Sequence, residues 1–178
     1  MSLSLTLLLG SCKKNNDNGS GAATIDYYIK FTLDGVDALY LNIAEGNMNV
    51  VDGNGKYTFT GGALKVANIA GSNSVALIVS NATPMTTNIN YTSYTYNVSG
   101  FQRAAYSTLG YTNASGITFV SWGDEYSNTG VISNSKINFT EITTTNLKGT
   151  FSGTVYKSLS GTSEKHVLTK GEFNLKRR

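Results

Sequence analysis

From residue 25 onward the chain repeats the two-residue period of β-strands, and this pattern constrains its fold more than any other feature. Residues 25–33 place isoleucine, tyrosine, phenylalanine or leucine at every second position, and Asp34-Gly35 follows as a turn. No window of about 11 residues shows the apolar stripe of an amphipathic helix. The sequence therefore predicts strands throughout.

Further strand-like runs are separated by clusters of turn-forming residues and cover 38–42, 56–60, 64–69, 75–80, 91–98, 104–111, 117–122, 136–143, 147–156 and 171–176. Short strands at this spacing are typical of sandwiches and barrels. We expect an all-β fold, an antiparallel β-sandwich of about ten short strands, with a β-barrel as the alternative.

Two glycine patterns carry local predictions. Gly149 and Gly153 interrupt the apolar face of the run 147–156, which indicates a bulge, a bend or close packing against an aromatic ring. Asp52-Gly53-Asn54-Gly55 faintly resembles a calcium loop, but the twelfth position, where an EF-hand needs glutamate, is Ala63. We expect a turn there, and no metal site.

Composition supports one folded domain over residues 24–178. Charged residues make up 14% of the chain, and there are 19 glycines and one proline. A coiled coil needs more charged residues than this chain has, and collagen needs a glycine at every third position, which this chain lacks. The composition therefore excludes both folds. A hydrophobic content of 40% is enough for a core, which argues against wholesale disorder.

The first residues have the pattern of an export signal. Residues 1–11 hold a short leucine-rich run that ends in Leu9-Gly10-Ser11-Cys12, the form of a bacterial lipobox. The run is too short to span a bilayer, which takes about 20 residues. No lysine or arginine precedes Cys12, and we expect a few basic residues upstream of the sequence given.

Cys12 is the only cysteine, so no internal disulfide can form, and lipidation would remove the liability of a free thiol. Residues 12–23 are polar and glycine-rich, which is typical of a flexible tether. The sequence thus predicts a lipid anchor at Cys12 in the outer membrane. Whether the domain faces the periplasm or the cell surface stays open.

The two ends of the domain carry a resemblance. Ile29-Lys30-Phe31-Thr32-Leu33-Asp34-Gly35 opens it, and Leu147-Lys148-Gly149-Thr150-Phe151 with Thr169-Lys170-Gly171-Glu172-Phe173-Asn174 closes it. These segments are similar to those of uncharacterised Bacteroidetes lipoproteins, a family with no assigned activity or site. The resemblance implies an all-β fold and a cell-envelope location, and says nothing about chemistry.

Catalytic residues are scarce. His166 is the only histidine and Cys12 is committed to lipid, which excludes Cys-His catalysis and histidine-rich zinc sites. A serine triad would need His166 with Glu164 or Glu172, but no Gly-x-Ser-x-Gly elbow exists. We expect His166 at the surface or at a strand edge, no cofactor, and no enzyme activity.

Asp124 and Glu125 form the only adjacent acidic pair, and Trp122 lies just before them. Paired carboxylates could hydrolyse a glycoside, and an aromatic ring could stack on a sugar. An ordinary solvated loop explains the same residues.

Tyrosines gather in the middle of the chain, among them Tyr91, Tyr94, Tyr96, Tyr106 and Tyr111. Tyrosine is enriched at recognition surfaces and is also a good strand residue. Trp122, Asp124, Glu125, Tyr94 and Tyr96 are the candidate ligand-binding residues.

The formal net charge is +3, and Lys176-Arg177-Arg178 end the chain. Such a basic end can touch acidic lipid or glycan, and the membrane address argues against nucleic acid. The sequence favours a non-catalytic binding module for glycan or protein. The alternatives are a structural or assembly component of the envelope and, last, a carboxylate glycoside hydrolase.

Overall fold

The computed structural model describes residues 27–65, 73–93, 105–123 and 128–178. Within these residues the chain forms eleven strands: β1 (Tyr28–Leu33), β2 (Val36–Tyr40), β3 (Asn42–Val51), β4 (Tyr57–Leu64), β5 (Ser74–Asn81), β6 (Asn90–Thr92), β7 (Ala105–Thr112), β8 (Thr118–Val120), β9 (Lys136–Ile142), β10 (Asn146–Tyr156) and β11 (Lys165–Arg177). The all-β prediction is confirmed. The predicted signal segment, Cys12 and the tether lie outside the described residues.

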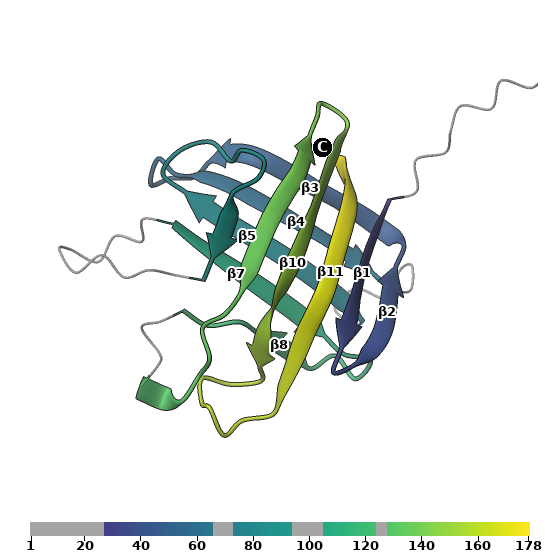
Figure 1. Ribbon diagram of the computed structural model, residues 1–178, viewed down its shortest axis with the longest axis vertical. Helices are drawn as coiled ribbons and strands as arrows, with labels where there is room; N and C mark the ends of the chain where they lie inside the picture. The colour runs from purple at the N-terminus through teal and green to yellow at the C-terminus, as the bar shows by residue number, and fades with distance from the viewer. Residues whose placement is uncertain (1–26, 66–72, 94–104, 124–127) are drawn as a thin grey trace, which may run out of the picture.

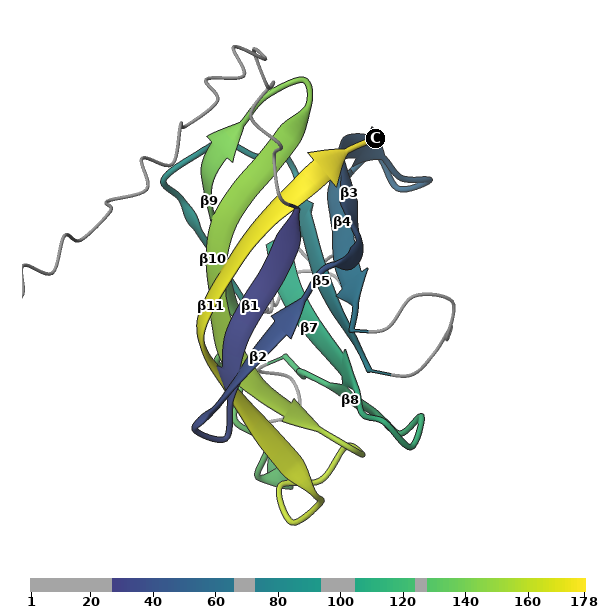
Figure 2. The ribbon, with the colours of Figure 1, turned by 90° about the vertical axis from the view of Figure 1, so that its right-hand side faces the viewer.

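All the described strands belong to one mixed, mostly antiparallel sheet with the order β2-β1-β11-β3-β4-β5-β7-β8-β10-β9-β6. Because β10 also pairs with β11, the sheet closes partly into a ring. Strands β9, β10, β11, β1 and β2 form one layer, which crosses β3, β4, β5 and β7 behind it (Figure 1). Figure 2 shows the two layers from the side. The sheet is thus folded into facing layers, and its partial ring is not a regular barrel.

The ring closes through short joints. Strand β3 meets β11 in parallel through only Lys176↔Glu45 and Arg177↔Gly46, and β8 meets β10 at Tyr156↔Val120. Between β7 and the residue that precedes β9, the buried hydroxyls of Ser107 and Ser135 lie 3.0 Å apart. Hydrogen bonds of this kind satisfy the polar groups that the incomplete ladder leaves inside.

Aromatic rings fill the space between the layers. The rings of Phe59 and Phe139 meet edge to face at 4.8 Å, and Phe173 packs against both. Gly149 lies directly beside the Phe173 ring, where a Cβ atom would be 2.7 Å from Cε1. A shift of register between Phe151 and Gly153 marks a β-bulge. Its extra residue lies in β11, which runs from Gly171 to Leu168 over the same stretch, and Lys170 there has a positive φ of 50°. Of the three alternatives predicted for these glycines, close packing against an aromatic ring is confirmed at Gly149.

Strand β3 was not predicted, because bulges disturb its two-residue period. Its register shifts between Asn42 and Glu45 and again between Met48 and Val50, where Ile43 and Asn49 adopt positive φ angles of 49° and 58°. Each extra residue moves the following side chains to the other face.

The predicted turn at residues 52–55 is confirmed. The Asp52 Oδ1 atom accepts hydrogen bonds from the backbone N–H groups of Asn54 and Lys56, at 2.8 and 2.9 Å. Gly55 has a positive φ of 74°, a conformation that suits glycine.

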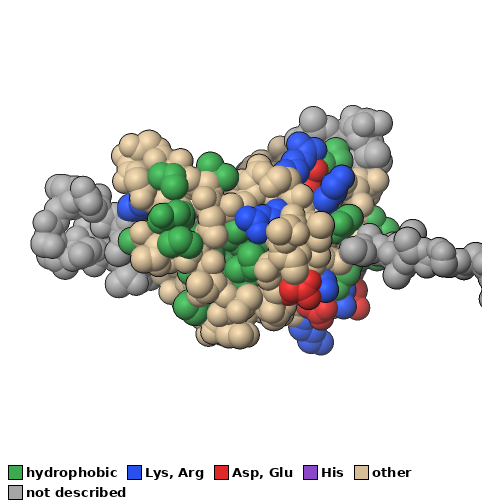
Figure 3. All heavy atoms as spheres, turned by 90° about the horizontal axis from the view of Figure 1, so that it is seen from above, with side chains coloured by type: hydrophobic (Ala, Val, Ile, Leu, Met, Phe, Trp, Pro, Cys, Tyr) green, Lys and Arg blue, Asp and Glu red, His purple; other side chains and the backbone are tan. Residues whose placement is uncertain are grey.

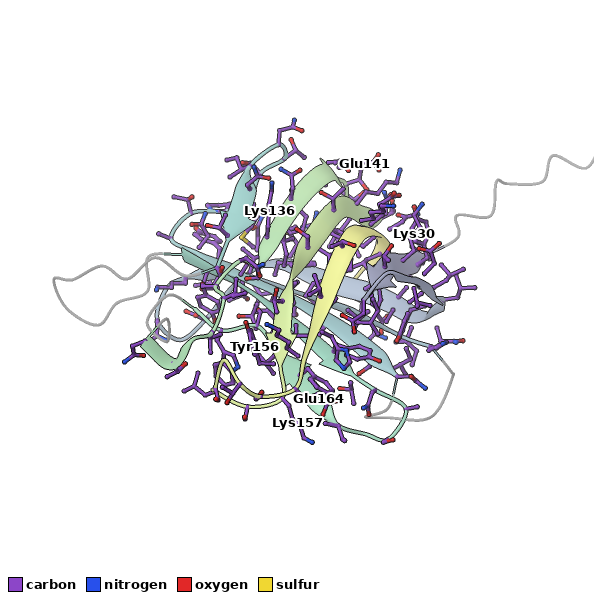
Figure 4. All side chains as sticks on the ribbon, turned by 60° about the horizontal axis from the view of Figure 1, so that its bottom comes forward. Lys30, Lys136, Glu141, Tyr156, Lys157 and Glu164 are labelled. Atoms are coloured by element: carbon purple, nitrogen blue, oxygen red, sulfur yellow. The ribbon has the colours of Figure 1, made fainter. Side chains whose placement is uncertain are left out.

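Exposed charges pair along the strands. Lys30 lies 2.9 Å from Glu172, and Lys148 lies 3.0 Å from Glu141. At the opposite end, Lys157 and Glu164 lie close together where β10 and β11 join (Figure 4). Viewed from above, basic and acidic side chains are intermixed (Figure 3). Each exposed ion pair contributes little to the stability of the fold. Because the two signs are intermixed on the surface seen in Figure 3, that surface carries no large electrostatic field of one sign.

Candidate functional site

A pocket lies where the chain leaves β5, crosses residues 82–89 and enters β6. Two anchors hold this crossing in place. The Met85 side chain is buried in the core, and its backbone N–H donates to Asn49 Oδ1 at 2.8 Å. The backbone N–H of Asn88 donates to the carbonyl of Phe139 at 2.8 Å. The crossing is therefore fastened to both β3 and β9.

Tyr91 is the buried aromatic residue that lines the inner side of the pocket. Its ring is buried against Phe139, and its hydroxyl oxygen accepts a hydrogen bond from the Thr86 N–H at 2.8 Å. Beside it, the Asn138 side chain donates to Asn90 Oδ1 at 3.2 Å. Because these bonds tie both ends of the crossing together, the pocket is preformed.

The pocket encloses about 260 Å³. None of its described wall residues is acidic or basic, and these are Asn81, Thr83, Pro84, Thr86, Ile89, Asn90, Tyr91, Thr92 and Tyr106. Amide and hydroxyl groups can both donate and accept hydrogen bonds. Pro84, Ile89 and the two tyrosines supply apolar surface. This combination suits a neutral, hydroxyl-rich ligand. The volume is slightly below the roughly 300 Å³ at which small-molecule pockets begin.

A second, larger hollow of about 440 Å³ lies over β3, β4 and β5. Its floor is bare backbone at Gly62, which pairs with Ala76, and its rim holds the ion pair of Arg178 with Glu45. The hollow is an open trough of small residues, with fewer converging polar groups than the pocket beside Tyr106.

His166 lies in a third cluster. Its Nδ1 atom is 2.6 Å from Oδ2 of Asp34, and its ring packs edge-on against Phe119 and Tyr111 at 4.5 and 5.4 Å. Its Nε2 atom is 4.0 Å from Oε1 of Glu164. The side chain is only 21% exposed, so the expected strand-edge histidine is largely covered. Glu172 pairs with Lys30 instead.

The cluster shifts the acidity of its members. Burial raises the pKa of Asp34, but the hydrogen bonds from His166 and the Val167 N–H outweigh it and lower that pKa overall. Burial, with a smaller contribution from the charge of Asp34, raises the pKa of Tyr111. Burial also raises the pKa of Tyr40 to about 12. The cluster thus favours an ionised Asp34 beside neutral tyrosines, and it connects the β1–β2 turn to β7, β8 and β11.

Of the residues predicted to bind a ligand, Trp122 is half-buried after β8 and does not line the pocket or the trough. Asp124, Glu125, Tyr94 and Tyr96 lie outside the described residues. The tyrosine-rich region does contribute Tyr91 and Tyr106 to the pocket. Asn81 and Asn90 were not predicted; the repeated asparagines between residues 81 and 90 are the signal that could have pointed to them.

Among the described residues, no group of three histidine, cysteine, aspartate or glutamate side chains could hold a metal ion. The same residues include no helix with the length and apolar character that a membrane span requires. Comparisons with protein-family models, curated proteins and solved structures gave no match to this chain.

Proposed function

We propose that this domain is a non-catalytic binding module that holds a neutral glycan in the pocket beside Tyr106, and that a lipid on Cys12 anchors it to the bacterial outer membrane. One observation carries the proposal: the described wall residues of the pocket combine amide and hydroxyl groups with an aromatic ring, and none of them is charged.

Sugars present hydroxyl groups that donate and accept hydrogen bonds in turn. Asn81, Asn90 and the threonines of the wall offer the same mixture, so each can match either role. Tyr106 offers an amphipathic ring against which the apolar face of a sugar can lie. A small pocket favours one sugar ring, at the end of a chain or as a branch.

The lack of charged side chains among the described wall residues selects among ligands. A phosphate or carboxylate entering this pocket would lose water without gaining a cationic partner, which is costly. We therefore expect neutral sugars to bind better than uronic or sialic acids.

The lipid anchor rests on the lipobox pattern that ends at Cys12 and on the polar residues that follow it. The described domain begins at Tyr27, and Tyr28 pairs with Asn174 near the end of β11. Labelling the cells with a radioactive fatty acid tests this part separately. Incorporation that Cys12→Ser abolishes would support the anchor, and incorporation into neither protein would contradict it.

A glycan array tests the binding function, using the full chain with Cys12→Ser to keep it soluble. We expect binding to neutral glycans, lost at least tenfold with Tyr106→Ala and weakened with Asn81→Ala. Tyr28→Ala is the matched control, because Tyr28 is also a half-buried strand tyrosine but lies outside the pocket.

Trp122→Ala separates the two candidate sites. Binding that survives Tyr106→Ala and disappears with Trp122→Ala would move the site to Trp122. An array on which the folded wild-type protein binds no glycan would contradict the proposed function.

A further inference from the structure

Strand β2 is the end of the sheet, and among the described strands it pairs only with β1. One side of its backbone therefore presents N–H and C=O groups without a strand beside them. Such an edge is a template for another strand, and natural proteins shorten it, charge it or cover it.

The opposite end of the sheet, β6, is shortened in this way. It has three residues, and Asn90 is bonded to Asn138 of β9. Strand β2 has five residues and contains neither lysine nor proline. Its one charged side chain, Asp37, accepts a hydrogen bond from Thr32 Oγ1 at 3.0 Å.

Apolar side chains are exposed along the β2 edge. Val36 is 70% exposed, Leu39 50%, and Leu41, directly after the strand, 57%. The edge is also held firmly. Asp34, in the turn before β2, accepts a hydrogen bond from the Val167 N–H and contacts His166. A rigid apolar edge can pair without first becoming ordered, which lowers the entropic cost of binding.

We infer that two copies of this chain pair through β2, antiparallel, with the two-fold axis at Ala38. In this register all five residues of β2 pair: Val36 opposes Tyr40 of the second copy, and Asp37 opposes Leu39. A register centred on Asp37 would bring the two Asp37 carboxylates face to face, which is unfavourable. The paired layers then form one continuous sheet across the dimer.

A two-fold contact between identical edges closes on itself, whereas β2 pairing with β6 of another copy would be head-to-tail and could continue into filaments. The contrast between the apolar β2 and the polar, three-residue β6 favours the closed dimer.

The contact is small. Five paired residues fall short of the roughly 800 Å² per partner of a standard interface, so the dimer in solution is weak. If both copies are anchored in one membrane, as proposed above, their effective concentration rises and the same contact becomes populated. The solution experiment below does not depend on the anchor.

Sedimentation equilibrium over a wide concentration range tests the dimer with the soluble Cys12→Ser chain. Leu39→Glu places a carboxylate opposite Lys30 within the same copy, which favours the β1–β2 hairpin, and opposite Asp37 of the second copy, which opposes the dimer. We expect this variant to be monomeric at every concentration at which the parent chain associates.

Ile132→Glu is the matched control, because Ile132 is equally exposed, at 50%, but lies away from β2. It should associate as the parent does. The double variant Asp37→Lys with Leu39→Glu should dimerise again, because each new carboxylate then faces a new ammonium group. A parent chain that stays monomeric throughout, or a Leu39→Glu variant that associates as tightly as Ile132→Glu, would overturn the inference.

Discussion

The imidazole of His166 and the carboxylate of Asp34, 132 residues apart in the chain, meet at 2.6 Å. The same carboxylate accepts the Val167 N–H at 2.7 Å through its other oxygen. One aspartate therefore bonds both to the backbone and to a side chain of β11, and in this way it fixes the β1–β2 turn against the longest strand.

Asp34→Asn should destabilise the protein by about 1 kcal/mol, since a charge-assisted hydrogen bond is lost at a site that is half exposed to water. Asparagine tolerates the positive φ of 49° at this position, so the backbone should be unaffected. Urea unfolding at neutral pH measures the change. Asp37→Asn is the control, and an equal loss in both variants would contradict a special role for Asp34.

Acid should remove the contribution of Asp34. Its folded-state pKa is lowered from 3.8, so the unfolded chain takes up the proton first as the pH falls. The stabilisation is complete above the unfolded value and is lost as the pH falls through the lower folded value. The difference in urea midpoint between wild type and Asp34→Asn should therefore shrink below about pH 4. A difference that stays constant down to pH 2 would contradict this linkage.

Alkali should destabilise the protein through Tyr40. Burial raises its pKa from 10.0 to about 12, so the unfolded state loses the proton first as the pH rises. The stabilisation is present below pH 10 and disappears as the pH rises through the folded value. Tyrosinate absorbance should show a late-titrating component, to which Tyr111 also contributes, and Tyr40→Phe should reduce it by one tyrosine. Identical titration curves for the two proteins would argue against it.

Gly149→Ala should cost about 1–3 kcal/mol, the usual range for overpacking, because the added methyl group would fall on the Asn138 carbonyl and the Phe173 ring. Gly53→Ala is the matched control, since nothing lies within 4 Å of the position that its Cβ atom would take. Thermal unfolding of both variants measures the difference. Equal midpoints would show that the layers can move apart to accept a methyl group.

The sequence predicts well what depends on neighbours in the chain. The alternation that defines β1, the turn at Asp34-Gly35 and the glycines of β10 all follow from local patterns, and the structure confirms them. Strand β3 escapes prediction because positive φ angles at Ile43 and Asn49 break its period.

The pocket was out of reach for a different reason. Its walls come from the end of β5, the crossing to β6 and Tyr106 at the start of β7. The long-range ladder between β5 and β7, in which Ser80 pairs with Tyr106, brings these parts together. From the sequence alone, asparagines and threonines in a β-rich chain are interpreted as turn-forming residues. Only the fold shows that those of this pocket lie close together in space.

The position of β11 in the sheet has a consequence for the order of folding. Strand β1 pairs with residues 168–174, so the first described strand obtains its second neighbour only when the last described strand has been made. The parallel joint to β3 uses Lys176 and Arg177 and waits even longer. Closing loops of this length is entropically costly, which slows folding. During synthesis the described sheet therefore stays open until residues 168–177 have left the ribosome, so the partial ring closes only after its other strands have been made.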